Sequence, residues 1–322
     1  MSGRPRAIVV GGLHTDIFFQ NSRELVAADR ATIADTIRIA GGGKSVNIAR
    51  MMATLLPSET VAMVGRTTHD PFGLWKPPLD SLEEASVITR YIKVSPFQGM
   101  FPGIAILQVD TNGNNASCLC QGIDNEFLEE DITSLEKLFV RVGKNKGLYI
   151  TSLEAPLQTV IAGKNMASKY GLKIMVEPGG LSNVRQVKEK LLGQDIFLLK
   201  PNEHEAEMLS GVPIRSFQSA RKAADILLAL GVGHILITAG KKGAYFFSGQ
   251  VAKHIPIPVI HTQSQEVDST GCGDQVLGTL GALLLQGKSL ERAVEQSIYA
   301  ATLQFYKKGV QPITSAELSS LA

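Results

Sequence analysis

Short apolar runs that alternate with helix-period segments constrain the fold of this chain more than any other feature. Each run has the length and composition of a buried strand. The runs cover Ala7–Val10, Val61–Val64, Gly147–Ile150, Lys173–Val176, Ile196–Leu199 and Ile235–Thr238. Helical patterns lie between them, at Ser45–Leu56, Leu157–Lys169, Glu203–Leu209, Ser219–Leu230, Asp274–Leu285 and Leu290–Tyr306. This alternation predicts a three-layer α/β fold, with a Rossmann-like, mostly parallel sheet and helices on both faces.

Two segments break the alternation and predict a small β-sheet lid. Weak strand signals lie within Ile17–Ala40. A second pattern is typical of a hairpin, with strands at Ile104–Asp110 and Ala116–Cys120 and a turn at Thr111–Asn114. We therefore expect one domain over residues 1–322, with lid insertions at about 13–40 and 95–122.

The composition narrows the classes of partner. The chain has 322 residues, of which 44% are hydrophobic, so it can bury a sizeable core. Lys and Arg number 32 and Asp and Glu number 30, a net charge of +2 that predicts neither nucleic-acid binding nor attachment to an acidic membrane surface. No stretch approaches the ~20 apolar residues that cross a bilayer.

The cysteines and the amino terminus predict a cytoplasmic protein. Cys118, Cys120 and Cys272 are odd in number and lack CxxC spacing, which favours a reducing compartment over disulfides or a zinc site. The first apolar run, Ala7–Val10, is far shorter than the hydrophobic region of a signal peptide.

The first glycine-rich loop, Gly41–Ser45, precedes a helix but fits no nucleotide-binding pattern. A P-loop requires a further glycine where this chain has Arg38. The earlier pair Gly11-Gly12 fails the dinucleotide-binding pattern, because Asp16 stands where its last glycine is needed. From spacing alone, both loops are interpreted as tight turns.

The second loop, Asp268–Asp274, has the properties of an anion site. Gly271 and Gly273 allow consecutive backbone N–H groups to converge, and the apolar helix that follows directs its amino end at the same point. Asp274 is then either a helix-capping residue or a base beside a phosphoryl-binding loop. The second interpretation is the chemistry of a kinase, in which catalysis is positioning and charge stabilisation.

Several motifs together resemble the ribokinase-like (PfkB-type) carbohydrate kinases. Asp268–Asp274 is similar to their carboxyl-terminal motif, and Gly42–Ala49 resembles their amino-terminal Gly-Gly-Lys-Gly-x-Asn-x-Ala. Pro201–Glu205 resembles their Pro-Asn-x-x-Glu, and Thr238–Gly243 their nucleotide-binding Thr-x-Gly-x-x-Gly. The order of these motifs is that of the family. The resemblance implies an ATP-dependent kinase that phosphorylates a hydroxyl of a sugar or sugar-like molecule.

The resemblance also implies roles for individual residues. Asp274 would accept the hydroxyl proton in front of Gly271, Cys272 and Gly273. Residues implied at the sugar are Asp16, Gly42, Gly43, Lys44, Asn47, Glu154 and Asp274. Residues implied at the nucleotide are Asn202, Thr238, Gly240, Gly243, Gly271 and Gly273. Asn202 and Glu205 would organise Mg²⁺ through water, and Asp268 and Thr270, with the loop after Lys308, would bind a monovalent cation, K⁺.

Structural interpretations of the same residues stay open. Lys44 fits a solvated lysine at a helix start, and Asn202 fits a simple helix cap. Glu154, before a proline, fits a surface turn, and His14 fits a packed or exposed bystander. Cys272 lies at a helix start, where N–H donors are expected to lower a thiol pKa and confer sensitivity to thiol reagents.

Departures from the family pattern leave the acceptor open. His14 stands where ribose-specific members usually have asparagine, Asp124 where they have asparagine after the hairpin, and Ser45 where they have glycine. Ribose leads as the acceptor by resemblance, against fructose, a sugar acid, a sugar phosphate or a nucleoside. A phosphorylated acceptor would need cations such as Arg38, Arg90 and Lys93; a nucleobase would stack on Phe18, Phe19, Phe97 or Phe101.

Two further expectations concern the whole protein. A relative that binds sugar or nucleotide as a sensor without catalysis is the alternative from another functional class, although such a protein has no need of a base beside an anion site. The exposed edges of the lid strands predict a homodimer formed through the lid.

Overall fold

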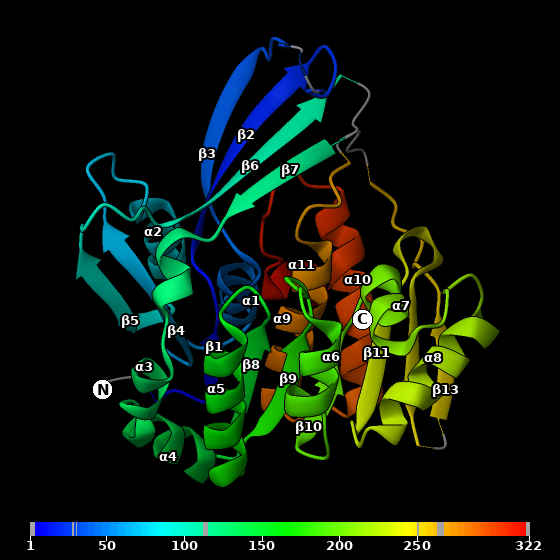
Figure 1. Cartoon of the computed structure of the whole chain (residues 1–322). Helices are drawn as coiled ribbons and strands as arrows, with labels where there is room; N and C mark the ends of the chain where they lie inside the picture. The colour runs from blue at the N-terminus through cyan, green and yellow to red at the C-terminus, as the bar shows by residue number, and fades with distance from the viewer. Residues whose placement is uncertain are drawn as a thin grey trace.

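A computed structural model describes residues 4–27, 29, 31–111, 115–249, 251–262 and 267–319 of the chain. Figure 1 shows one large sheet between two layers of helices, with a smaller sheet standing over one edge. The predicted three-layer α/β fold with a β-sheet lid is therefore confirmed. Most of the predicted hairpin turn, residues 112–114, lies outside the described part of the chain.

The large sheet has nine strands in the order β13-β12-β11-β10-β9-β8-β1-β4-β5. The strands from β11 to β5 in this order all run parallel to one another. Strand β12 pairs antiparallel with β11 on one side and with β13 on the other. Their bounds are β1 Ala7–Val10, β4 Val61–His69, β5 Ile88–Pro96, β8 Leu148–Ser152, β9 Lys173–Glu177, β10 Ile196–Leu199, β11 His234–Thr238, β12 Ala244–Ser248 and β13 Val251–Ile255. All six strands predicted from apolar runs are present.

Helices cover both faces of this sheet because successive strand residues point to opposite faces. Ile8 and Val10 of β1 pack in one buried cluster, and Val9 packs in the other. The first face carries α3 (Glu129–Thr133), α4 (Glu136–Lys144), α5 (Leu157–Lys169), α6 (Val184–Gln186), α7 (Glu203–Ser210) and α8 (Phe217–Ala229). The second carries α1 (Lys44–Ala53), α2 (Lys76–Glu84), α9 (Cys272–Leu285), α10 (Leu290–Phe305) and α11 (Ser315–Ser319).

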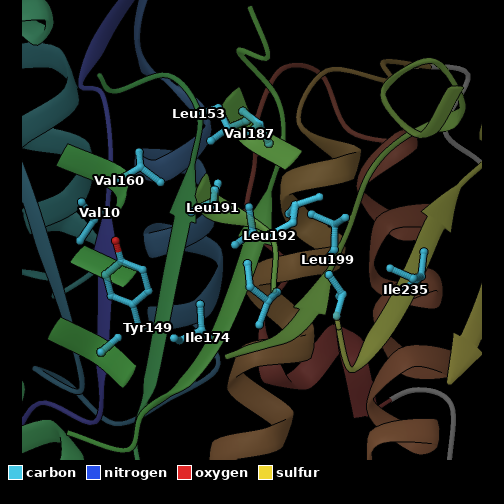
Figure 2. Close-up of a cluster of buried hydrophobic side chains, with 14 of the residues drawn as sticks. Val10, Tyr149, Leu153, Val160, Ile174, Val187, Leu191, Leu192, Leu199 and Ile235 are labelled. Carbon is cyan, nitrogen blue, oxygen red and sulfur yellow. The ribbon is translucent and has the colours of Figure 1, made fainter. Parts of the chain in front are cut away.

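The cluster in Figure 2 shows how closely one helix layer meets the sheet. Tyr149 of β8 lies beside Val160 of α5 and Val10 of β1. A Cβ at Gly163 of α5 would lie 2.1 Å from the Tyr149 hydroxyl. Only glycine lets α5 approach the aromatic ring this closely, so this position fixes the distance between helix and sheet.

The lid is a separate four-stranded sheet in the order β3-β2-β6-β7. Its strands are β2 (His14–Ser22), β3 (Thr36–Gly42), β6 (Gly103–Asp110) and β7 (Asn115–Cys120). β2 pairs with β3 antiparallel and with β6 parallel. In Figure 1 the lid stands above the edge at which the parallel strands end, because β2 follows β1 almost directly.

Several elements have no counterpart in the sequence-based prediction. These are α2, α3, α4, α6, α11, β5, β12, β13, the π-helix Val187–Leu191 and the 3₁₀ helices Gly122–Glu126 and Gly240–Lys242. Strand β5 lies at an edge of the sheet and alternates buried Ile88 and Ile92 with polar residues, which hides it from a search for continuous apolar runs. The first turn of α2 contains Pro77 and Pro78, which are typical of a turn as much as of a helix start.

Candidate active site

The candidate site lies at the carboxyl ends of the parallel strands, where side chains from both halves of the sheet meet. β1 leads into Gly11 and Gly12, β8 into Glu154, and β10 into Lys200. A cavity of about 640 Å³ opens at this edge. Its lining includes Lys44, Glu177, Lys200, Asn202, Thr238, Gly240, Gly243, Gly271, Cys272, Gly273 and Asp274.

Asp274 and Lys44, 230 residues apart in the sequence, face each other because α1 and α9 start at the same place. The carboxylate of Asp274, only 4% exposed, accepts a hydrogen bond from Asn47 Nδ2 (2.9 Å). Lys44 Nζ lies 3.9 Å from the other carboxylate oxygen. Burial raises the pKa of Asp274, while the Lys44 ammonium opposes that rise. A buried carboxyl group whose pKa is raised toward neutrality has the property required of a general base.

The acceptor side of the site is formed by residues from the lid hinge and the loop after β8. A Cβ at Gly42 would lie 2.1 Å from the Asp16 carboxylate, so glycine is required for this close approach. Glu154 Oε2 accepts the backbone N–H of Lys44 at 2.7 Å. Burial raises the pKa of Asp16 to about 6 and that of Glu154 to about 7. Glu154 is buried, so the structure does not support the surface-turn interpretation.

His14 is neither a free bystander nor a cavity-lining side chain. Its Nε2 lies 3.0 Å from Asp124 Oδ2, and both side chains are buried. Glycines surround the imidazole: Cβ atoms at Gly12 and Gly103 would lie 2.8 and 2.4 Å from it. Burial alone would lower the pKa of His14, but Asp124 and the nearby carboxylates raise it to about 9. The two departures from the family pattern, at positions 14 and 124, therefore form one buried ion pair.

Ser45, the third departure, has a structural role at the start of α1. Its hydroxyl donates to the carbonyl oxygen of Val10 (3.0 Å) and lies 2.9 Å from Ser152 Oγ. A Cβ at Gly11 would lie 2.1 Å from this hydroxyl. Ser45 therefore ties α1 to the ends of β1 and β8, and faces away from the cavity.

Glu177 and Lys200 are site residues that the motif search missed. Glu177 Oε1 lies 3.2 Å from Lys44 Nζ and 3.2 Å from Lys200 Nζ. Although burial would raise the pKa of Glu177, the two lysines hold it below its usual range. The available signal was positional, because each residue stands at the carboxyl end of a predicted apolar strand, where sites gather.

The glycine-rich loop before α9 has the conformation expected of an anion site. Gly271 adopts a left-handed φ of 76°, and its carbonyl oxygen accepts the N–H of Gln275 at 2.8 Å. This turn directs the loop into the amino end of α9, where backbone N–H groups are free to bind anions. Gly273, Cys272 and Asp274 line the cavity beside it.

The expected activation of Cys272 is wrong. Burial raises the pKa of its thiol to about 12, and the carboxylates of Asp268 and Asp274 add to the rise. The helix amino end does not compensate, because two negative groups flank the sulfur. At neutral pH Cys272 is a protonated thiol, so the structure does not support sensitivity to thiol reagents.

The residues implied at the nucleotide line the same cavity as Asp274. Thr238, Gly240 and Gly243 line the cavity, and the backbone of Thr238 forms an isolated parallel β-bridge with that of Asn202. Asn202 caps α7: its Oδ1 accepts the N–H of Glu205 at 2.8 Å, and Glu205 Oε2 accepts the N–H of Asn202 at 2.9 Å. The cap interpretation of Asn202 is therefore correct, and its position on the cavity wall leaves a second role open.

Asp268 and Thr270 join the loop before α9 to the loop after α10. Asp268 Oδ2 accepts the N–H of Gly309 (2.9 Å), and its Oδ1 accepts the N–H of Thr270 (2.9 Å). The carbonyl oxygen of Thr270 accepts Gln304 Nε2 at 2.7 Å. Oxygen atoms of residues 268 and 270 and the backbone near Gly309 thus lie within one small region.

Of the three cations considered for a phosphorylated acceptor, Arg38 lies on the face of the lid that carries Asp16 and, against the effect of burial, lowers the pKa of that carboxyl group, whereas Lys93 and Arg90 have partners elsewhere. Lys93 Nζ binds Asp131 at 2.7 Å, and the Arg90 guanidinium lies over the Tyr91 ring. Arg38 stacks over Phe18 at 3.8 Å on the inner face of the lid.

The four aromatic residues considered for a nucleobase do not form one stack either. Phe18 and Phe19 are neighbours in β2 and point to opposite faces of the lid. Phe97 and Phe101 contact each other, with ring centroids 5.2 Å apart.

The described residues contain neither a membrane-spanning helix nor a cluster of three or more His, Cys, Asp or Glu side chains suited to a metal ion.

Comparisons with known proteins agree with this geometry. The model for "pfkB family carbohydrate kinase" matches residues 6–317. The chain is 25% identical to a ribokinase of Staphylococcus aureus over 309 residues, or 95% of each chain. It is 27% identical to a deoxyribokinase of Salmonella typhi, covering 86% of this chain and 85% of that protein. An Arabidopsis thaliana ribokinase solved with ribose and ATP superposes with a TM-score of 0.83, at 24% identity and 99% coverage of both chains.

Proposed function

Because this chain belongs to the pfkB family of carbohydrate kinases, we propose that it transfers the γ-phosphoryl group of ATP to a hydroxyl group of ribose. The enzyme is a sugar kinase of the ribokinase type, a phosphotransferase with an alcohol group as acceptor. The observation that carries the proposal is the meeting of Asp274, Asn47 and Lys44 beside the loop at Gly271.

In this proposal the acceptor oxygen attacks the γ-phosphorus while Asp274 accepts its proton. The new O–P bond forms as the bond between the γ-phosphorus and the bridging oxygen breaks, and the electron pair leaves with ADP. Asn47 orients the carboxylate through its 2.9 Å hydrogen bond. Negative charge on the transferring group is held by the backbone N–H groups of Gly271 and Gly273 and by Lys44.

Asp16 and Glu154 would bind the other hydroxyl groups of the sugar. Ionised carboxylates accept hydrogen bonds from vicinal hydroxyls, and Gly42 and Gly43 let the substrate approach the backbone closely. The Arabidopsis thaliana relative was solved with ribose, which supports ribose here. The Salmonella typhi relative is a deoxyribokinase, so 2-deoxyribose is the second candidate.

Oxygen donors at two places suit metal ions. Asn202 at the cavity wall and buried Glu205 offer hard oxygen ligands, so they would hold Mg²⁺ through water. The ion would neutralise phosphate charge. Asp268 and Thr270, linked to Gly309, would hold K⁺ outside the reaction path.

We also propose that the protein is cytoplasmic and forms a homodimer. All three cysteines are free, which is consistent with a cytoplasmic protein. The lid presents an outer face with exposed Phe19, Ile37, Ile39 and Ile106, which supports a homodimer that buries this face.

A coupled ADP-release screen tests the function. It would include pentoses, 2-deoxyribose, hexoses, sugar acids, their phosphates and nucleosides, with and without K⁺. We expect turnover with ribose, and Asp274→Asn to lower kcat by at least about 10³-fold while ADP and ribose still bind, because the amide cannot accept the proton. Lys169→Met, at the opposite end of the sheet, is the control. Binding of ribose and ATP by the wild type without turnover of any acceptor would instead indicate a sensor.

A further inference from the structure

A buried lysine that no recognised motif contains lies directly behind the anion-binding loop. Lys200 is 1% exposed and follows the last residue of β10. Its Nζ donates to the carbonyl oxygen of Gly273 (3.2 Å) and to Glu177 Oε1 (3.2 Å). A Cβ at Gly273 would lie 3.0 Å from this ammonium, so the cation sits against the loop itself.

Glu177 joins Lys200 to Lys44, whose Nζ lies 3.9 Å from Asp274 Oδ1. The same oxygen, Oε1, lies 3.2 Å from both ammonium groups, and Oε2 accepts the N–H of Gly179 at 2.6 Å. A Cβ at Gly179 would lie 1.9 Å from Lys44 Cε, so a glycine there leaves room for the lysine stem. The carboxylate of Glu177 is thus fixed between two cations, one beside the Gly273 carbonyl group and one beside the proposed base.

This cluster lines a cavity and is not enclosed in the core. Lys44, Glu177, Lys200 and Asp274 all line the cavity that the loop at Gly271 opens into. A buried lysine–glutamate pair is a weak source of stability, because desolvation opposes the attraction between the charges. Because stability does not account for the pair of Lys200 and Glu177, its position at the cavity wall indicates a role in function.

The charges around the cavity show what Lys200 would do. Glu177 and Asp274 line the wall, and the carboxyl group of buried Glu205 lies behind Asn202, another lining residue. A phosphate that enters this region meets negative charge. Lys241 also lines the cavity, but of the lysines there only Lys44 and Lys200 bind Glu177, so without Lys200 a single ammonium would offset the charge of that carboxylate beside the phosphate.

We propose that Lys200 supplies a second positive charge to the phosphoryl group in transit, and that Glu177 positions it by binding both Lys200 and Lys44. The proposal rests on the phosphoryl transfer proposed above and deepens it. Lys200 acts across the loop and through the Gly273 carbonyl group, so its effect is greatest when charge builds up on the transferring group. Ribose binding, which involves the lid hinge, does not depend on it.

Lys200→Met tests the charge, since methionine keeps an unbranched, apolar stem. We expect kcat to fall by about 10²–10³-fold, the usual effect of losing one charge-stabilising group, with the KM for ribose within about twofold of wild type. Lys200→Arg restores part of kcat. Lys169→Met removes an exposed lysine whose partner is Glu136, and serves as the matched control.

A binding measurement separates this role from a structural one. Wild-type protein should bind ADP with aluminium fluoride, a mimic of the transferring group, more tightly than ADP alone. Lys200→Met should lose this tightening and keep its affinity for ADP. Equal losses in both affinities, or a wild-type kcat in Lys200→Met, would overturn the proposal. If Lys200→Met does not fold, Lys200→Gln takes its place in the same measurements, because its amide can still donate a hydrogen bond to the Gly273 carbonyl oxygen.

The outcome also distinguishes this inference from the proposed function. The wild-type enzyme is assayed first with ribose and the other acceptors. Absence of transfer to all of them overturns the proposed function and this inference together. Transfer by the wild type and by Lys200→Met at equal kcat overturns only the role of Lys200.

Discussion

Single residues at the acceptor site owe their chemistry to charged neighbours. Asp16 and Glu154 are buried, and burial raises the pKa of both, to about 6 and about 7. The protonated imidazole of His14 opposes that rise, because it lies near both carboxylates while paired with Asp124. The ion pair of His14 and Asp124 therefore helps to keep the proposed hydroxyl-binding groups ionised at neutral pH.

This arrangement predicts a pH effect. Ionised Asp16 and Glu154 are required to bind the sugar, so kcat/KM for ribose should fall as the pH drops through 7 and 6. His14→Gln keeps a hydrogen-bond donor for Asp124 but removes the charge, which raises the pKa of both carboxylates. The acid limb of the kcat/KM profile should move upward by roughly one pH unit.

The control for this prediction is His69→Gln. His69 is exposed and stacks on Trp75, and no carboxylate pairs with it among the described residues. The acid limb of the kcat/KM profile of His69→Gln should match that of the wild type. Identical acid limbs in His14→Gln and wild type would show that the imidazolium has no influence on the carboxylates.

At the scale of elements, the start of α9 determines how the anion site is built. Gly271 is the residue before the helix, and its left-handed φ of 76° turns the chain from the loop into α9, whose first residues line the cavity. A Cβ there would lie 2.9 Å from a methyl group of Val310, in the loop after α10. Both the backbone angle and the packing require glycine.

Gly271→Ala should therefore lower kcat by about 10–100-fold, because the N–H groups move away from the transferring group. Gly287→Ala is the matched control: Gly287 follows the same helix with φ 83°, but no atom lies within 4 Å of its Cβ position. Both variants should lose roughly 1 kcal/mol or more of stability from strain at positive φ, and Gly271→Ala should lose more because its Cβ would also contact Val310. A kcat equally unaffected in both variants would contradict a role for the loop geometry.

At the scale of the whole molecule, the lid has an apolar face that stays exposed to solvent in a monomer. Ile37 and Ile39 of β3 are 60% and 50% exposed, and Ile106 of β6 is 44% exposed. Strand pairing places these residues with Phe19 on the face of the lid that points away from Asp16. The structure thus supports pairing of lid faces, where the sequence had suggested pairing of strand edges.

The variant Ile39→Lys with Ile106→Lys places two charges on this face and should give a monomer. Light scattering with size exclusion should show twice the chain mass for wild type and once the chain mass for the variant. Ile226→Lys, at a position 38% exposed on α8, is the control and should remain dimeric. A monomeric wild type would contradict the proposed dimer.

The fold could be predicted where burial dictates composition. Strand β1 is buried on both faces, so its residues are apolar without interruption and the pattern is visible. β5 and β13 lie at the edges of the sheet, where solvent permits polar residues, and they were missed. The motifs at Gly42–Lys44 and Gly271–Asp274 were visible because backbone geometry requires glycine in fixed spacing.

By itself the sequence determined the alternation of elements, the two glycine-rich turns and the family to which they are similar. The tertiary structure alone decided which charged groups share one site. Glu177 and Lys200 carry no local signal beyond their place at strand ends, and the pairing of His14 with Asp124 joins positions 110 residues apart. Local sequence encodes backbone conformation and burial, whereas the pKa of a side chain such as Cys272 depends on neighbours that only folding brings together.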